Sequence, residues 1–76
     1  LPLGTNIILK EFTVERWAGK TLRDLDLTNS FGIQVVAVKG LEEKQFVFVP
    51  KADQPLRKGD VLAVIGRGEK LLDLES

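Results

Sequence analysis

The chain has 76 residues, and its hydrophobic fraction of 43% beside a charged fraction of 29% is typical of one folded domain. Eleven basic and eleven acidic residues cancel, so the chain lacks the basic field that holds a nucleic-acid backbone, and we expect no nucleic-acid partner. The sequence has no His and no Cys. This removes the commonest general base, the best neutral-pH nucleophile, disulfides and thiolate metal sites, so we expect no enzyme.

A domain of this size is small for an independent fold, because it buries only roughly 60% of the surface that its unfolded chain exposes. Such domains often gain stability by docking against a copy of themselves or a larger neighbour. The sequence contains no Met, which indicates a piece of a longer polypeptide or a trimmed subunit. No apolar run approaches the roughly 20 residues that span a bilayer, and no signal-peptide pattern opens the chain. Together with the lack of Cys, this favours a reducing cytoplasm.

The predicted elements begin after a short tail. Residues 1–5 contain Pro and Gly and are interpreted as a tail or linker before a single domain over residues 6–76. The segment Ile7–Val14 is rich in β-branched and aromatic side chains, which predicts a strand. Trp17 follows in a turn that ends at Gly19, and we expect its side chain to pack at the edge of the sheet.

A short helix is predicted next. Thr21 and Asp24 have the spacing of a capping box, in which a hydroxyl accepts from the backbone three residues on and an acidic side chain accepts in return. Leu22 and Leu25 share one helix face, which is expected to bury against the sheet. The helix has about two turns and is expected to end within residues 27–30.

The rest of the chain alternates apolar segments with turns. Gly32 allows a positive φ as the chain leaves the helix. The predicted strands are Ile33–Val38, Gln45–Val49 (stopped by Pro50) and Asp60–Ile65, separated by a charged hairpin loop over 39–44 and a polar connection over 51–59, with a Gly66–Gly68 turn leading into a helix over 69–74. Four strands and two short helices predict an α+β domain with a small antiparallel sheet of about four strands.

Several short motifs occur in a fixed order between about Ala18 and Leu74. They are "GKTLRDLDL", a step "FGIQVVAV" into an apolar strand, a strand that ends in Pro50, "LRKGDVL", and a small-residue turn into an apolar helix. In order and spacing the chain resembles the C-terminal domain of TrkA-type potassium-uptake regulators. This domain is also called the C-lobe of the RCK module, for regulator of potassium conductance.

The resemblance implies a TrkA C-terminal domain-like fold that forms a homodimer. It also implies partners: a Rossmann-type nucleotide-binding lobe or subunit, and a membrane potassium channel or transporter subunit. NAD, ATP or ADP would bind that partner lobe, since this chain has no G-x-G-x-x-G motif. Some members of the family bind cyclic di-AMP between two copies. A cytoplasmic protein, held at the inner membrane through its transporter, is the implied location.

The loop after the first predicted helix is the candidate ligand site. From residue types alone it also fits a helix C-terminus satisfied by Asn29 and Ser30, with Gly32 in a left-handed turn. The resemblance implies that this segment supplies part of a dimer cleft for cyclic di-AMP. The candidate residues are Asp26, Thr28, Asn29, Ser30, Phe31, Gly32 and Ile33. Nucleotide-binding members often carry a basic residue near Thr28 or Ser30. The neutral residues here favour dimerisation over nucleotide binding, because hydrogen bonds to a charged partner are the stronger ones.

Other polar residues have a simpler interpretation. The acidic pairs Asp24/Asp26 and Glu42/Glu43 carry oxygen ligands that suit hard cations. Neighbouring side chains in a helix or hairpin point apart, however, so we expect solvated faces. Arg67, between two glycines, is either part of an anion site at a helix start or a solvated side chain in a turn.

Taken together, these features predict a regulatory ligand-sensing and dimerisation domain of a potassium channel or uptake system, which transmits effector binding to gating. One alternative is the same C-lobe regulating a cation/proton antiporter or another transporter. A second alternative is a dimerisation adaptor with no ligand.

Overall fold

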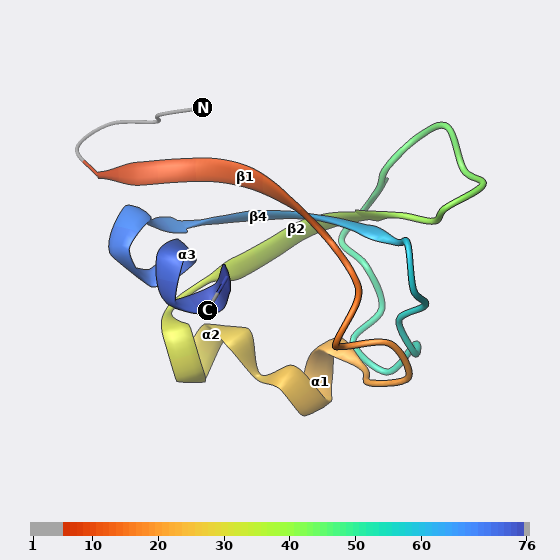
Figure 1. Cartoon of the computed structure of the whole chain (residues 1–76), viewed down its shortest axis with the longest axis horizontal. Coiled ribbons are helices and arrows are strands. Elements are labelled where there is room, and N and C mark those ends of the chain that lie inside the picture. The colour runs from red at the N-terminus through yellow and green to blue at the C-terminus, as the bar shows by residue number, and fades with distance from the viewer. Residues whose placement is uncertain (1–5, 76) are drawn as a thin grey trace.

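The computed structural model describes residues 6–75, so the tail predicted for residues 1–5 lies outside the described residues. This part of the chain forms one four-stranded sheet and three short helices (Figure 1). The elements are β1 (Ile7–Thr13), α1 (Leu22–Leu25), α2 (Leu27–Phe31), β2 (Gln34–Lys39), β3 (Val47–Phe48), β4 (Val61–Arg67) and α3 (Gly68–Glu75).

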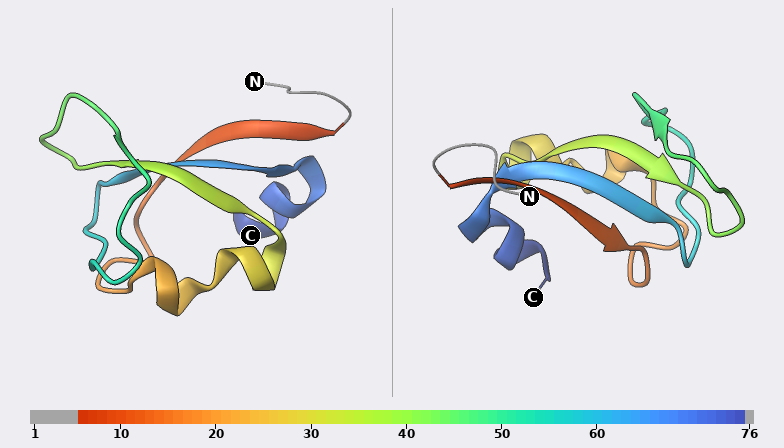
Figure 2. Two further views of the ribbon diagram at one scale, coloured as in Figure 1. Left: turned by 180° about the vertical axis from the view of Figure 1, so that it is seen from behind. Right: turned by 90° about the horizontal axis from the view of Figure 1, so that it is seen from above.

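The sheet is antiparallel, with the strand order β1-β4-β2-β3. β4 is central and pairs with β1 along seven residues, from Ile7 opposite Arg67 to Thr13 opposite Val61. The three helices lie on one face of this sheet, whereas its other face carries no helix among the described residues (Figures 1 and 2). The predicted α+β class with a four-stranded antiparallel sheet is confirmed.

The hydrophobic core lies between the sheet and the helices. In β4, Leu62 and Val64 are fully buried on the helix-facing side because alternate side chains of a strand point to the same face. The core cluster consists of Val14, Leu27, Ile33, Leu56, Leu62, Val64, Leu71 and Leu74. Trp17 and Phe31 are half-buried and pack against this cluster, so Trp17 has the packing role that the sequence predicts.

The first predicted helix is divided at one residue. Asp26 has left-handed backbone angles, φ 46° and ψ 47°, so α1 ends before it and α2 begins after it. Asp tolerates this conformation better than most residues. In an uninterrupted helix Leu25 and Leu27, two positions apart, would not share a face. The break at Asp26 lets both leucines pack against the core, and Leu27 is buried.

The predicted turn at Gly66–Gly68 is wrong, because β4 continues through Arg67 and α3 starts directly at Gly68. Gly66 lies opposite Ile8 in the β1–β4 ladder. A Cβ at Gly66 would lie 3.0 Å from Cγ1 of Ile33, which is fully buried. The glycine therefore permits close packing against Ile33 rather than a change of direction.

The predicted strand Gln45–Val49 is also shorter than expected, since β3 contains only Val47 and Phe48. These two residues pair with Val38 and Ala37 of β2. The segment before β3 forms a loop that extends away from the body of the molecule (Figure 1). β3 is therefore a short edge strand, which limits the number of unpaired backbone groups at that edge of the sheet.

The predicted capping box is confirmed at the start of α1. The backbone N–H of Asp24 donates to Oγ1 of Thr21 at 3.0 Å, and the backbone N–H of Thr21 donates to Oδ2 of Asp24 at 3.1 Å. We expect Thr21→Ala to lower the free energy of unfolding by about 1 kcal/mol, since it removes the N-cap acceptor. Urea unfolding measures this, with Thr21→Ser as the control that keeps the hydroxyl. Equal losses in the two variants would contradict a capping role.

Acid is expected to weaken the same cap. The hydrogen bonds from the backbone and side chain of Thr21 lower the pKa of Asp24 below its ordinary value. A carboxyl with a lowered folded-state pKa stabilises the fold above its unfolded-state pKa, and this stabilisation is lost as the pH falls through the folded-state pKa. Between about pH 5 and pH 3, the free energy of unfolding should fall more steeply in the wild type than in Asp24→Asn. Parallel profiles from urea titrations would contradict this.

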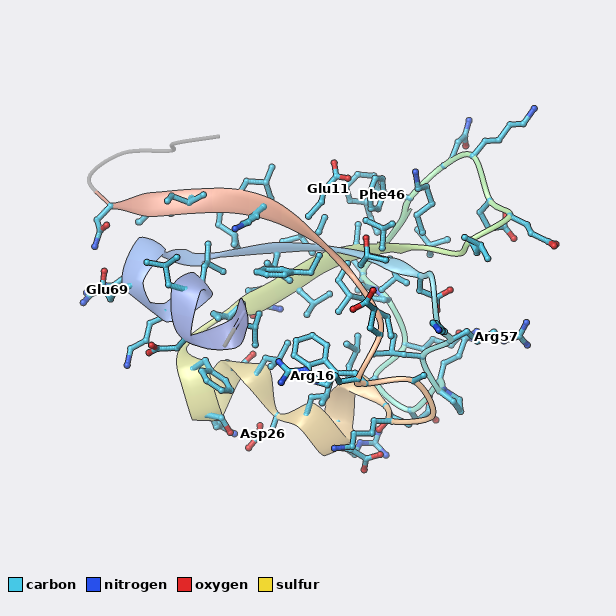
Figure 3. All side chains as sticks on the ribbon, in the orientation of Figure 1. Glu11, Arg16, Asp26, Phe46, Arg57 and Glu69 are labelled. Atoms are coloured by element: carbon cyan, nitrogen blue, oxygen red, sulfur yellow. The ribbon has the colours of Figure 1, made fainter. Side chains whose placement is uncertain are left out.

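Glu69 should contribute to acid sensitivity in the same direction. The Asn6 side chain donates from Nδ2 to Oε2 of Glu69 at 2.6 Å and lowers the pKa of this carboxyl. Figure 3 shows Glu69 at the end of the molecule where β1 begins. This hydrogen bond therefore joins the start of α3 to the residue that precedes β1.

Candidate functional site

A hollow of about 250 Å³ opens beside the two short helices. Its walls come from α1 and α2, from the start of β2 and from the segment that follows β3. The lining residues are Leu22, Arg23, Asp26, Leu27, Thr28, Ile33, Gln34, Val35, Pro50 and Ala52. Polar and apolar groups contribute about equally to this surface. Small-ligand sites combine apolar walls with a few polar groups in a similar way, although they are usually more apolar.

Backbone hydrogen bonds hold the wall after β3 against the start of α1. The N–H of Arg23 donates to the carbonyl of Ala52 at 2.9 Å, and the N–H of Leu56 donates to the carbonyl of Lys20 at 2.8 Å. Figure 2 shows the two segments running close together below the sheet. These hydrogen bonds place Pro50 and Ala52 opposite the helices, where both line the hollow.

Asp26 lies at the junction of α1 and α2 (Figure 3). Its Oδ1 accepts a hydrogen bond from Nδ2 of Asn29 at 2.9 Å, which orients the carboxylate. The side chain is exposed, so it can accept further hydrogen bonds from a ligand.

The end of α2 is closed mainly by its backbone. The N–H groups of Gly32 and Ile33 donate to the carbonyl groups of Thr28 and Leu27 at 3.0 Å and 3.2 Å. Gly32 has φ 69°, so the predicted left-handed turn is confirmed. The Thr28 hydroxyl donates to the carbonyl of Ile33 at 3.3 Å. The alternative in which Asn29 and Ser30 satisfy the helix end does not hold for Asn29, whose side chain donates instead to Asp26.

The seven residues proposed from the sequence fall into two groups. Asp26, Thr28 and Ile33 line the hollow. Asn29 and Ser30 are exposed on α2, Gly32 caps this helix, and Phe31 lines a second hollow together with Trp17 and Leu25. The first hollow is also lined by seven residues that the sequence does not predict as site residues: Leu22, Arg23, Leu27, Gln34, Val35, Pro50 and Ala52. The capping box predicts where α1 begins, but no sequence signal indicates that the α1 residues, Pro50 or Ala52 line a hollow.

The charges in the hollow come from two side chains. Arg23 supplies a guanidinium from α1, and Asp26 supplies a carboxylate from the helix junction. Gln34 adds an amide, which both donates and accepts hydrogen bonds. An apolar ring system carrying an anion and hydrogen-bond donors is therefore the ligand chemistry that the lining favours.

An exposed apolar edge continues from one wall of this hollow. Val47, Phe48 and Val49 are 63%, 72% and 89% exposed, and Pro50 follows them directly. Val49 has φ 53°, which is an outlier for a β-branched residue, and its N–H donates to the carbonyl of Val36 at 3.3 Å. Exposed apolar patches and retained backbone strain are both features of interaction sites.

Within residues 6–75, no cluster of three or more metal-ligating side chains is present. Asp24 is engaged in the capping box and Asp26 accepts from Asn29, so each has a partner other than a metal. No helix in the same range is both long enough and apolar enough to cross a membrane.

The sequence matches the model of the TrkA-C domain over residues 9–76. It is 37% identical over 71 residues to Ktr system potassium uptake protein A of Vibrio alginolyticus. This alignment covers 92% of this chain and 31% of that protein. The chain thus spans less than a third of this relative's length. Potassium transport is the process that the relative's name states.

Solved structures share the fold. The RCK C domain of the potassium transport protein KtrA, in complex with cyclic diadenosine monophosphate, has a TM-score of 0.83 and 30% identity, covering 91% of this chain and 80% of that one. An RCK_C domain dimer of S. agalactiae BusR with c-di-AMP has a TM-score of 0.72 and 18% identity, covering 88% of this chain and 90% of that one.

BusR has also been solved with its busA-promotor DNA. That structure has a TM-score of 0.74 and 18% identity, covering 99% of this chain and 38% of that chain. BusR therefore combines this fold with DNA binding, whereas the expectation of no nucleic-acid partner for this chain stays a prediction. For this chain, the balance of eleven basic and eleven acidic residues still offers no basic field.

Proposed function

Because the chain belongs to the TrkA-C domain family, we propose that it is the ligand-sensing and dimerising domain of a potassium uptake system or channel. The domain itself is regulatory and not catalytic. The observation that carries the proposal is the hollow beside α1 and α2, which combines apolar walls with a guanidinium, a carboxylate and an amide. The potassium-transport protein KtrA, solved with a cyclic dinucleotide, has the same fold.

The hollow is proposed to be half of a site for cyclic di-AMP. Its volume of about 250 Å³ lies below the roughly 300–1,000 Å³ of typical small-ligand pockets. A cyclic dinucleotide made of two identical halves suits two copies of one hollow related by a two-fold axis. Asp26 and Thr28, which are exposed, would contact the ligand directly, and the fully buried Ile33 would support the wall of the pocket from behind. Asn29, Ser30, Phe31 and Gly32 would shape the segment or meet the second copy.

The second copy is proposed to cover the apolar edge formed by Val47, Phe48 and Val49. This edge is continuous with Pro50, which lines the hollow, so one docking event would both bury the edge and complete the pocket. A small domain with a limited core gains stability from such burial.

Gating of the pore is proposed to follow from a movement of the two copies relative to each other. Ligand binding between two copies changes how they sit, and this rigid-body change passes to a membrane pore. The ligand shifts the pore only by the difference in its affinity for the two arrangements. NAD, ATP or ADP would bind a partner Rossmann lobe. The domain would work on the cytoplasmic side of the inner membrane, held there through the transporter.

Two alternatives keep the same fold. The domain could regulate a cation/proton antiporter or another transporter, or it could dimerise its host without a ligand. A neighbouring Rossmann lobe and a potassium-pore gene would favour the potassium system, whereas a fused antiporter membrane domain would favour the first alternative. A dimer that shows no response to any ligand would favour the adaptor.

The dimer is the first part to test. Light scattering of the purified chain at high micromolar concentration should give twice the chain mass of 8.4 kDa. Added cyclic di-AMP should raise the melting temperature, because a ligand that binds only the folded form stabilises it. A monomer at that concentration would count against the dimer, and a folded dimer with an unchanged melting temperature would count against the ligand.

A further inference from the structure

Arg23 is the only cationic side chain among the residues that line the hollow beside α1 and α2. The geometry points to Arg23 as the residue that pairs with a phosphate of a bound cyclic dinucleotide, an inference that rests on the proposed function. Thr28, Asn29 and Ser30 on α2 are neutral. The charge for anion binding in this chain therefore comes from the first helix and not from the second.

The backbone of Arg23 is fixed where the two walls meet. Its N–H donates to the carbonyl of Ala52 at 2.9 Å, so the residue is tied to the wall that Pro50 begins. The capping box of Thr21 and Asp24 fixes the same helical turn. A guanidinium that starts from an anchored backbone loses less conformational freedom when it binds, which favours affinity.

The carboxylates nearest in sequence have other partners. Oδ2 of Asp24 accepts from the Thr21 backbone, and Oδ1 of Asp26 accepts from Asn29. The charge of Arg23 also acts on neighbouring Asp24, whose pKa is lowered mainly by the hydrogen bonds from Thr21 and further by Arg23. The Arg23 side chain is exposed. Its planar guanidinium can therefore meet a phosphate through two parallel hydrogen bonds, the geometry in which Arg binds anions most strongly.

The charges of the ligand and the site also match. A cyclic dinucleotide has two phosphodiester groups with one negative charge each, and two copies of this chain bring two Arg23 side chains. Asp26 in the same hollow is an acceptor, so it suits a donor on the nucleoside, such as a ribose hydroxyl or the adenine amino group. Leu22 and Pro50, which are half-buried, offer apolar surface to the purine.

Calorimetric titration of cyclic di-AMP into four forms of the chain, the wild type and three variants, tests this assignment. Arg23→Gln should weaken binding roughly 10- to 100-fold, as loss of a hydrogen bond between charged groups predicts. It should also reduce the salt dependence of the affinity, because the screened interaction is gone. Arg57→Gln is the matched control: it removes the same charge at the end of the molecule away from Asp26 (Figure 3) and should change the affinity less than about twofold.

A rescue variant separates charge from shape. In Arg23→Gln/Thr28→Arg the cation returns to the same hollow from α2, since Thr28 also lines it, and binding should recover. If Arg23→Gln binds as tightly as the wild type, or if the rescue variant stays as weak as Arg23→Gln, the assignment is overturned while the proposed function stands. If the folded wild-type dimer does not bind cyclic di-AMP, both the assignment and the proposed ligand are overturned.

Discussion

Leu62→Ala is expected to lower the free energy of unfolding by about 2–5 kcal/mol. Leu62 is fully buried near the start of β4, on the face that packs against the helices. Its truncation loses apolar burial and leaves a cavity between rigid elements. A chain of this length has a total stability of roughly 4–11 kcal/mol, so the variant loses a large share of it. The melting temperature should fall by about 10 °C or more.

The control for this prediction is Leu72→Ala, the same substitution on α3, where Leu72 is 65% exposed. Its effect should stay within about 0.5 kcal/mol, as for most surface substitutions. Both variants are measured by urea unfolding at one fixed protein concentration, since dimerisation makes apparent stability concentration-dependent. Equal losses would mean that Leu62 does not face the core.

Phe48→Asp is expected to disrupt the dimer while the single chain remains folded. Phe48 is 72% exposed on the short edge strand β3, so the folded chain tolerates a polar residue there. In the dimer, each copy loses an apolar contact worth at least about 1.5 kcal/mol and gains a poorly solvated charge. Because a two-fold interface contains the substitution twice, the dissociation constant should rise at least about 100-fold.

Sedimentation equilibrium measures this constant, and circular dichroism verifies the fold. Leu72→Asp serves as the control, since it places the same charge at a similarly exposed leucine on α3. It should leave the dissociation constant unchanged. If Phe48→Asp dimerises like the wild type, the second copy does not cover the Val47–Val49 edge.

Local chemistry made much of the fold predictable. The capping box of Thr21 and Asp24 and the left-handed turn at Gly32 depend on neighbouring residues only, and both are confirmed. The division of the first helix at Asp26 was missed because the left-handed conformation of an Asp is stabilised by burial of Leu27, a tertiary effect. The sequence predicts a turn at Gly66, because glycine is common in turns. The actual reason for this glycine is its close contact with Ile33, which is far away in the sequence and leaves no local signal.

The sequence predicts only those residues of the candidate site that lie close together in the chain. Asp26, Thr28 and Ile33 lie within one short segment, and all three line the hollow. The opposite wall depends on the hydrogen bond from the Arg23 backbone to Ala52. Two segments so distant in the chain show no periodicity or motif that links them, so the contribution of Arg23 and Pro50 emerged only from the fold.

Native mass spectrometry of the wild-type chain with cyclic di-AMP tests the central claim most directly, because it counts chains and ligands in one complex. Two half-sites that close around one symmetric ligand predict a species of two chains and one cyclic di-AMP. A complex of one chain with one ligand, or a dimer that stays ligand-free at saturating nucleotide, would contradict the shared site.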